Sequence, residues 1–98
     1  MVKSVKWNKR ALQKMREIVN YLQINASDKV ANGFADAVYY QISRLRKQPE
    51  IGRPVVTTKT IRFINVNKHR QLFYRIKGST LHIANFFDTR QDPDKRLY

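Results

Sequence analysis

The chain contains no cysteine and few glycines, and these absences exclude several kinds of functional site. Without cysteine it can form neither a disulfide nor a thiolate metal site. Its 3 glycines are widely spaced, so they cannot form a glycine-rich loop around a phosphate group. The histidines are His69 and His82, and no carboxylate lies near either of them in sequence. We therefore expect neither a bound metal ion nor a cofactor.

Acidic residues are also scarce, and one long segment has none. The 98 residues include 20 Lys and Arg but only 7 Asp and Glu, which gives a net charge of +13. No carboxylate side chain lies between Glu50 and Asp88. Such an imbalance is typical of proteins that bind nucleic acid and, less often, an acidic protein. The basic residues in this segment are Arg53, Lys59, Arg62, Lys68, Arg70, Arg75 and Lys77.

Long apolar runs are missing as well. No run approaches the roughly 20 apolar residues that a membrane-spanning helix needs, so we expect no contact with a membrane. The basic N-terminal segment is not followed by an apolar run and does not resemble a signal peptide. The absence of cysteine is compatible with a reducing cytoplasm. From the length, we expect a single domain over residues 1–98.

Apolar residues at helical spacing predict two helices. The first runs from Lys9 to Ile24, with Asn8 as its N-terminal cap. The second follows the capping residue Ser27 and ends at Lys47, because Pro49 disfavours helical backbone before it. The short break between them predicts an antiparallel helical hairpin. The residues expected to face the core are Leu12, Met15, Val19 and Leu22, then Val30, Phe34, Val38, Ile42 and Leu45.

Short apolar segments predict strands on both sides of this hairpin. Residues 2–7 alternate in the manner of an edge strand. After an irregular connector over residues 48–58, three further strands are expected at residues 60–66, 70–77 and 80–88. The turns between them fall at Asn67-Lys68 and Gly78-Ser79. The expected fold is α+β: an N-terminal strand, a two-helix antiparallel hairpin and a three-stranded antiparallel meander.

The middle strand of the meander predicts which face of the sheet the helices cover. Leu72, Tyr74 and Ile76 share one face and should pack on the helices. Arg75 belongs to the opposite face, which we expect to remain open to solvent. The acid-free segment should then form one uncompensated cationic surface there, suited to an anionic partner.

Cleavage of RNA through its own 2′-hydroxyl group is the chemistry that these residue types allow. It needs a base, an acid and cations that stabilise the anionic phosphorus centre. The catalytic candidates are Arg62, His69 and Arg90, the RNA-binding candidates are Lys59, Arg70 and Arg75, and Tyr98 is a further candidate. Simpler roles stay open: His69 as a turn residue, and Arg90 in a salt bridge with Asp88 or Asp92.

Motifs over nearly the whole chain fit one known family. The sequence LFYRI at residues 72–76 and the sequence DTRQDP at residues 88–93 carry this fit together. Further matches are Trp7, Ala11 and Leu12 near the N-terminus, and Leu45, Pro49 and Gly52-Arg53 around the connector. With these motifs the chain resembles the RelE/ParE superfamily of toxins from bacterial type II toxin–antitoxin pairs, whose fold is the one expected above.

The resemblance implies a small cytoplasmic toxin that a cognate antitoxin holds inactive by wrapping it with an extended or helical segment. RelE-like members are similar to ribonucleases that cut mRNA on the ribosome, whereas ParE-like members are similar to inhibitors of DNA gyrase. Arg90 matches the RelE-type arginine after the last strand, and Arg62 falls near a basic position. Gln71, however, stands where RelE-like members have a middle-strand arginine, and many ParE-like members share the RQDP ending.

Three hypotheses follow from the resemblance. The first is a toxin that cleaves mRNA on the ribosome, which makes it a metal-independent endoribonuclease. The second is a toxin that binds and inhibits DNA gyrase without enzymatic activity. The third is a domain that has lost its toxicity and only binds its antitoxin.

Overall fold

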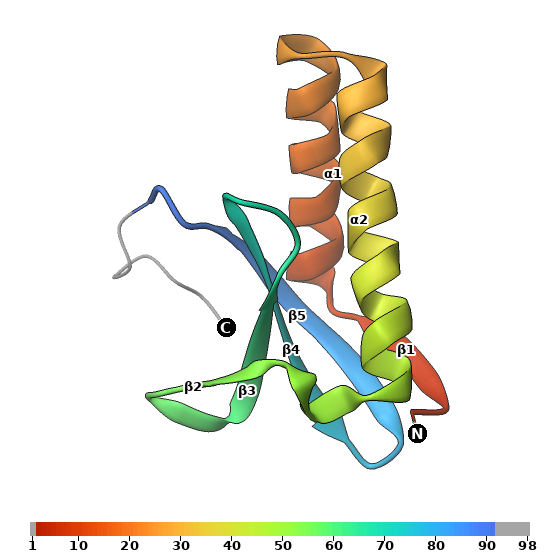
Figure 1. The fold of residues 1–98 in the computed structure, drawn as a ribbon, viewed down its shortest axis with the longest axis vertical. Coiled ribbons are helices and arrows are strands. Elements are labelled where there is room, and N and C mark those ends of the chain that lie inside the picture. Colours follow the sequence, from red (N-terminus) through yellow and green to blue (C-terminus); the bar gives the residue numbers. More distant parts are fainter. Residues whose placement is uncertain (1, 92–98) are drawn as a thin grey trace.

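Two long helices lie side by side and pack against one face of a five-stranded sheet (Figure 1). The computed structural model describes residues 2–91, apart from the side chain of Lys59. In chain order the elements are β1 (Ser4–Trp7), α1 (Lys9–Asn25), α2 (Asp28–Lys47), a 3₁₀ turn (Pro49–Ile51), β2 (Arg53–Val55), β3 (Thr58–Asn65), β4 (Arg70–Lys77) and β5 (Thr80–Asp88). The predicted α+β fold is confirmed.

The sheet has the order β1-β5-β4-β3-β2. Strands β3, β4 and β5 form the expected antiparallel meander, and β1 lies at one edge, as its sequence predicts. Strand β1 runs parallel to β5, with Ser4 opposite Thr80. The turn between β4 and β5 contains Gly78 at φ +61°, a conformation that glycine adopts without strain.

The connector between α2 and the meander is more regular than its sequence predicts. It contains a 3₁₀ turn and the short strand β2, which pairs with β3 at the other edge of the sheet. The sequence conceals β2 because it has only three residues and includes Pro54. Proline is tolerated there because an edge strand leaves one row of N–H groups unpaired.

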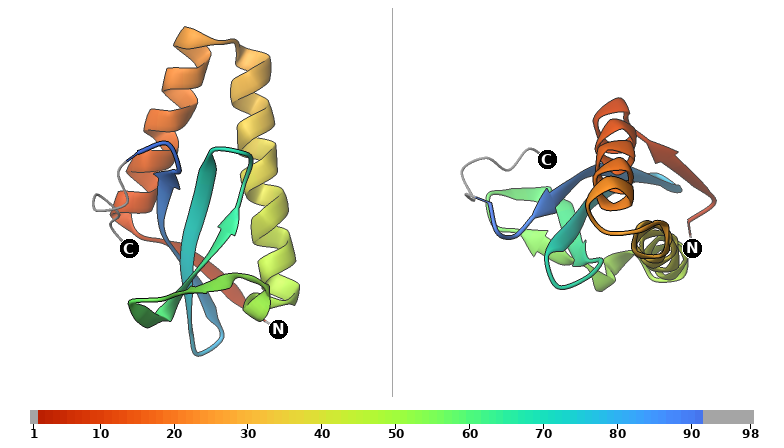
Figure 2. Two further views of the ribbon diagram at one scale, coloured as in Figure 1. Left: turned by 60° about the vertical axis from the view of Figure 1, so that its left-hand side comes forward. Right: turned by 90° about the horizontal axis from the view of Figure 1, so that it is seen from above.

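Both helices begin at the predicted caps. The Asn8 side chain accepts a hydrogen bond from the backbone N–H of Ala11 (2.8 Å), and Ser27 Oγ accepts one from Val30 (3.1 Å). These bonds satisfy N–H groups that the first turn of a helix leaves without partners. The helices extend beyond the sheet: the β3–β4 turn and the end of β5 stop well short of the hairpin tip (Figure 2).

The main core lies between the helices and the sheet. Most expected helix residues are buried there, but Leu12 and Val30 are 40% and 49% exposed, so these two expectations were wrong. The neighbouring residues Ala11 and Ala31 occupy the buried positions instead. From β4, Leu72 and Tyr74 are fully buried, while Ile76 is 38% exposed.

A second, smaller core covers part of the opposite face of the sheet. Its buried members are Val55, Ile61, Phe73, Ala84 and Phe87. The prediction that this face remains open was therefore wrong for the half next to β2 and β3. The sequence does not reveal this core because it requires β2, which brings Val55 into contact with the sheet.

Candidate functional site

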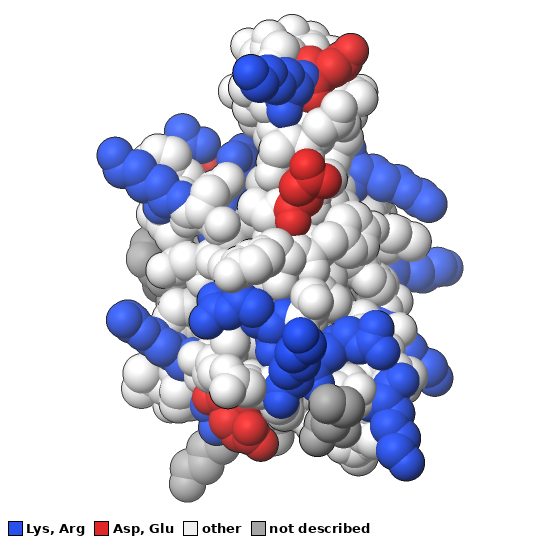
Figure 3. Space-filling view, turned by 45° about the vertical axis from the view of Figure 1, so that its right-hand side comes forward, with Lys and Arg blue, Asp and Glu red and all other residues white. Residues whose placement is uncertain are grey.

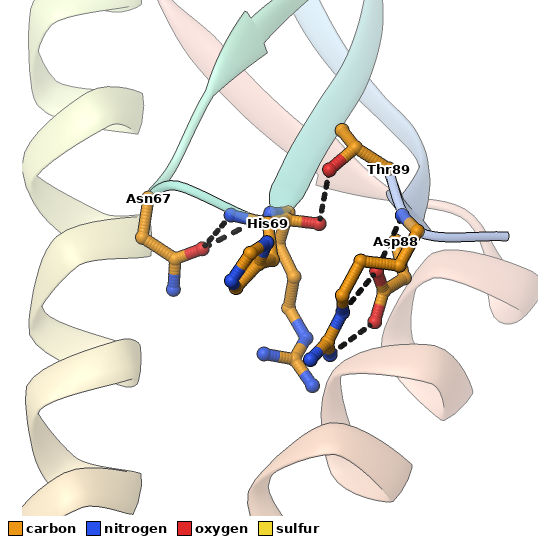
Figure 4. A network of polar contacts seen from close by, with 6 residues as sticks. Asn67, His69, Asp88 and Thr89 are labelled. Atoms are coloured by element: carbon orange, nitrogen blue, oxygen red, sulfur yellow. Dashed lines mark hydrogen bonds and ion pairs between the residues drawn. The ribbon is translucent and has the colours of Figure 1, made fainter.

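The β3–β4 turn and the end of β5 lie side by side (Figure 4). The Asn67 side chain accepts hydrogen bonds from the backbone N–H groups of His69 (3.1 Å) and Arg70 (3.0 Å). The carbonyl oxygen of His69 accepts hydrogen bonds from the N–H (2.7 Å) and hydroxyl (3.3 Å) of Thr89. In the strand register, Arg70 of β4 lies opposite Asp88 of β5. These contacts place His69 and Arg70 beside the chain that leaves β5.

Arg90 forms a two-pronged ion pair with Asp88. Its Nε and Nη2 atoms donate to the two carboxylate oxygens at 3.0 and 2.7 Å, and its backbone N–H donates at 2.9 Å. The hydrogen bonds and charge of Arg90 hold the pKa of Asp88 at about 2, against its partial burial. Of the two roles considered for Arg90, the structure shows the salt bridge. The guanidinium group that was expected to stabilise a transition state is therefore bound to the Asp88 carboxylate.

Arg70 points toward the helices. Its guanidinium carbon lies 5.5 Å from the ring centroid of Phe34 in α2, within the range of a cation–π contact. Beside it a cavity of about 430 Å³ opens between α1 and the end of β5. Its lining includes Lys14, Glu17 and Tyr21 from α1, Phe86 and Phe87 from β5, and Arg70, Asp88 and Arg90 at the sheet end. This mixture of aromatic surface and both charges suits a peptide segment as well as a nucleotide.

Arg62 lies elsewhere, under the connector that follows α2. Its Nη1 donates to the carbonyl oxygens of Gly52 (2.8 Å) and Glu50 (3.2 Å). In the strand register, Arg62 of β3 lies opposite Tyr74 of β4. Tyr74 is four residues from Arg70, which corresponds to about 13 Å between them along β4. Arg62 therefore supports the connector and does not join the arginines at the far end of β4.

Tyr74 completes this support. Its hydroxyl donates to the carbonyl oxygen of Pro49 (2.7 Å) and accepts from the N–H of Gly52 (3.0 Å). Burial raises the pKa of Tyr74, while the Gly52 hydrogen bond and the charge of Arg62 oppose that rise. Sequence reasoning placed Tyr74 in the core correctly but missed these contacts. Gly52 was the sequence signal that could have indicated this close approach, because a Cβ atom at residue 52 would collide with the Tyr74 hydroxyl.

The remaining candidates are dispersed. Arg75 is exposed on the sheet face away from the helices, opposite His82. Lys59 belongs to β3, but its side chain is not described, and Tyr98 lies outside the described residues. Because Arg62 and Arg70 lie on the helix-facing side, the expectation of one cationic surface on the opposite side was wrong.

The positive charge is nevertheless mostly uncompensated. In the described part of the chain, the ion pairs with carboxylates are Arg90–Asp88 and Lys14–Glu17. On the face shown in Figure 3, Lys and Arg side chains gather over the half that holds the sheet and the C-terminal end of α2, and Asp and Glu side chains are sparse there. A fold with this surface suits partners that carry negative charge.

The described residues offer neither a metal site nor a membrane-spanning helix. Residues 2–91 contain no group of three or more His, Cys, Asp or Glu side chains that could hold a metal ion. Within the same range, neither helix is long and apolar enough to cross a membrane.

Comparison with known families decides the family of this fold. Residues 5–93 match the family described as the ParE toxin of the type II toxin–antitoxin system, parDE. The chain belongs to the ParE toxin family. A search of curated protein sequences found no relative that matches it. The predicted RelE/ParE superfamily membership is thereby confirmed, and the chain is the toxin of a type II toxin–antitoxin system.

Solved structures of several toxins share the fold of this ParE-family chain. The chromosomal ParDE system from P. aeruginosa matches with a TM-score of 0.76 and 18% identity, covering 89% of this chain and 96% of that one. The YoeB/ParE toxin from Agrobacterium tumefaciens matches at 0.66 and 12%, covering 88% and 98%. The DinJ–YafQ complex from E. coli matches at 0.63 and 12%, covering 92% and 96%. At these identities the likeness concerns the fold.

Proposed function

We propose that this ParE-family toxin acts in the cytoplasm by binding DNA gyrase, without cutting RNA. The observation that carries the proposal is the state of the two arginines that RNA cleavage would use. Arg90 is held by Asp88, and Arg62 is held by two backbone carbonyl groups. The strand positions opposite Arg62 and Asp88, which are Tyr74 and Arg70, lie about 13 Å apart along β4. Transition-state stabilisation needs donors that already point at the developing charge. The family match, which is to ParE toxins, favours the same reading.

A cognate antitoxin neutralises the toxin in this proposal. Support comes from the similar ParDE and DinJ–YafQ structures, which are a toxin–antitoxin system and a toxin–antitoxin complex. The net charge of +13 favours an acidic antitoxin. Added salt should therefore weaken the complex where the charged contacts are exposed.

Cleavage of mRNA on the ribosome is the second candidate function. Its support is the proximity of His69, Arg70 and Arg90 at one end of the sheet, next to the cavity. For this function Arg90 would have to exchange Asp88 for a phosphate group. His69 would then supply the acid or base, and Arg70 a further cation.

Two assays on the same cells and the same purified chain separate these functions. We expect that induced expression leaves transcript ends unchanged, and that the purified chain inhibits supercoiling of plasmid DNA by gyrase. The variants His69→Ala and Arg90→Ala should retain this inhibition. New transcript ends that depend on Arg90, with supercoiling unaffected, would overturn the proposal in favour of mRNA cleavage. Soluble chain with neither effect would mean that only antitoxin binding remains.

A further inference from the structure

The face of the sheet away from the helices has one area that the second core does not cover. It lies where β1, β5 and the end of β4 run side by side. There the strand register sets Lys6 opposite His82, and His82 opposite Arg75. The next row on the same face is Ser4, Thr80 and Lys77. We call these six residues the basic ladder.

The orientation of the ladder follows from its neighbours. Val5 and Trp7 in β1, and Leu81 and Ile83 in β5, pack into the main core on the helix side. The alternating residues Lys6 and His82 therefore face the other way. Neighbouring strands lie about 4.8 Å apart, so the Cα atoms of Lys6 and Arg75 are about 10 Å apart across β5.

The ladder carries positive charge that the described residues do not neutralise. Lys6, Arg75 and Lys77 are exposed, and none forms an ion pair with a carboxylate in the described part of the chain. Partial burial lowers the pKa of His82, and the charges of Arg75, Lys6 and Lys77 lower it further. The sheet thus places like charges on the two strands that flank β5, with no carboxylate between them, an arrangement that suits an anionic partner.

We propose that the basic ladder binds the phosphate backbone of duplex DNA without reading its sequence. Lysine, arginine and the hydroxyl groups of serine and threonine are the side chains that most often contact phosphates. The choice of DNA over duplex RNA rests on the proposed function, because gyrase holds DNA. The ladder is at the opposite end of β4 from the cavity and Arg90, so it forms a separate surface.

The composition of the ladder favours a duplex over other anionic partners. It has no Phe, Tyr or Trp side chain, the aromatic residues on which proteins that bind single strands usually stack unpaired bases. It also lacks the Tyr, Trp, Phe, Met or aliphatic residues that form the centre of a protein interface. A duplex hides its bases and presents phosphates, which is the chemistry that this surface can bind.

A binding assay with two charge-matched variants tests the proposal. One carries Lys6→Gln, Arg75→Gln and Lys77→Gln, and the control carries Arg16→Gln, Lys29→Gln and Lys68→Gln, which are exposed elsewhere. We expect the ladder variant to bind a fluorescent 20-base-pair duplex at least tenfold more weakly than the control. Its slope of log affinity against log salt should fall by about 2 to 3. Equal losses in both variants would overturn the proposal, since they would mean that net charge alone attracts DNA.

The His82 ring gives a readout that needs no substitution. Phosphates on the ladder offset the charges of Lys6, Arg75 and Lys77, so the pKa of His82 should rise when DNA is added. An NMR titration of the His82 ring protons with and without duplex measures this shift. An unchanged pKa at saturating DNA would contradict the proposal, and so would stronger binding of duplex RNA, single-stranded DNA or a polyglutamate peptide.

DNA binding by the basic ladder and inhibition of gyrase can be tested independently. Binding of DNA through the ladder by a chain that leaves gyrase active would refute gyrase inhibition alone. Gyrase inhibition by a chain that does not bind free duplex DNA would refute the ladder alone.

Discussion

Replacing Tyr74 with phenylalanine tests the link between the sheet and the connector that follows α2. The ring keeps its place in the main core, so only the hydroxyl group is lost. That hydroxyl donates to Pro49 and accepts from Gly52, both across a separation of more than 20 residues. The substitution therefore leaves one N–H group and one carbonyl group of the connector without this partner.

The expected cost follows from these two bonds. A net hydrogen bond contributes about 1 kcal/mol, and a buried group left unpaired costs about 1–3 kcal/mol. The N–H of Gly52 is such a group, since Gly52 is buried. We expect Tyr74→Phe to lower the free energy of unfolding by about 2–3 kcal/mol, a large part of the 5–15 kcal/mol typical of a domain.

Urea unfolding followed by circular dichroism measures this change. Tyr40→Phe is the matched control, because Tyr40 is 63% exposed. It should change the stability by less than about 0.5 kcal/mol, as most surface substitutions do. A Tyr74→Phe variant as stable as this control would refute the role assigned to the hydroxyl.

Three further predictions concern other local contacts. Gly52→Ala should destabilise the fold at least as much as Tyr74→Phe, because the new Cβ would lie only 2.7 and 2.8 Å from ring carbons of Tyr74; equal urea midpoints for Gly52→Ala and wild type would contradict this. Asp88 has a pKa of about 2 in the folded state against an ordinary 3.8, so the stability gained from pairing with Arg90 should be complete above about pH 4 and lost as the pH falls toward 2. Urea midpoints should lose that pH dependence in Asp88→Asn. Ser27→Ala removes the cap of α2 and should cost about 1 kcal/mol in thermal unfolding, whereas Ser27→Asp should retain the stability of wild type.

The helices and the meander could be predicted because their signals are local. The capping side chains of Asn8 and Ser27 lie three residues from the N–H groups that they bind. Gly78 marks the β4–β5 turn through its own backbone conformation. Such features depend on neighbouring residues, which the sequence displays directly.

The candidate site was harder to predict because it depends on contacts between distant segments. The carbonyl partners of Arg62 lie in the connector, 10 and 12 residues away, and their positions depend on the 3₁₀ turn and β2. Asp88 lies only two residues from Arg90, so this pairing could be named as an alternative from sequence. Whether it forms could not be decided, because that depends on how the chain turns after β5.

The parallel pairing of β1 with β5 has a consequence for folding of the toxin during its synthesis. Ser4 and Thr80 lie 76 residues apart, so β1 has no partner until synthesis has passed Thr80. Such long-range pairing is slow to form. A chain truncated before Thr80 lacks β5, the strand that both β1 and β4 need. Synthesis that is interrupted before β5 should therefore yield fragments without the toxin fold.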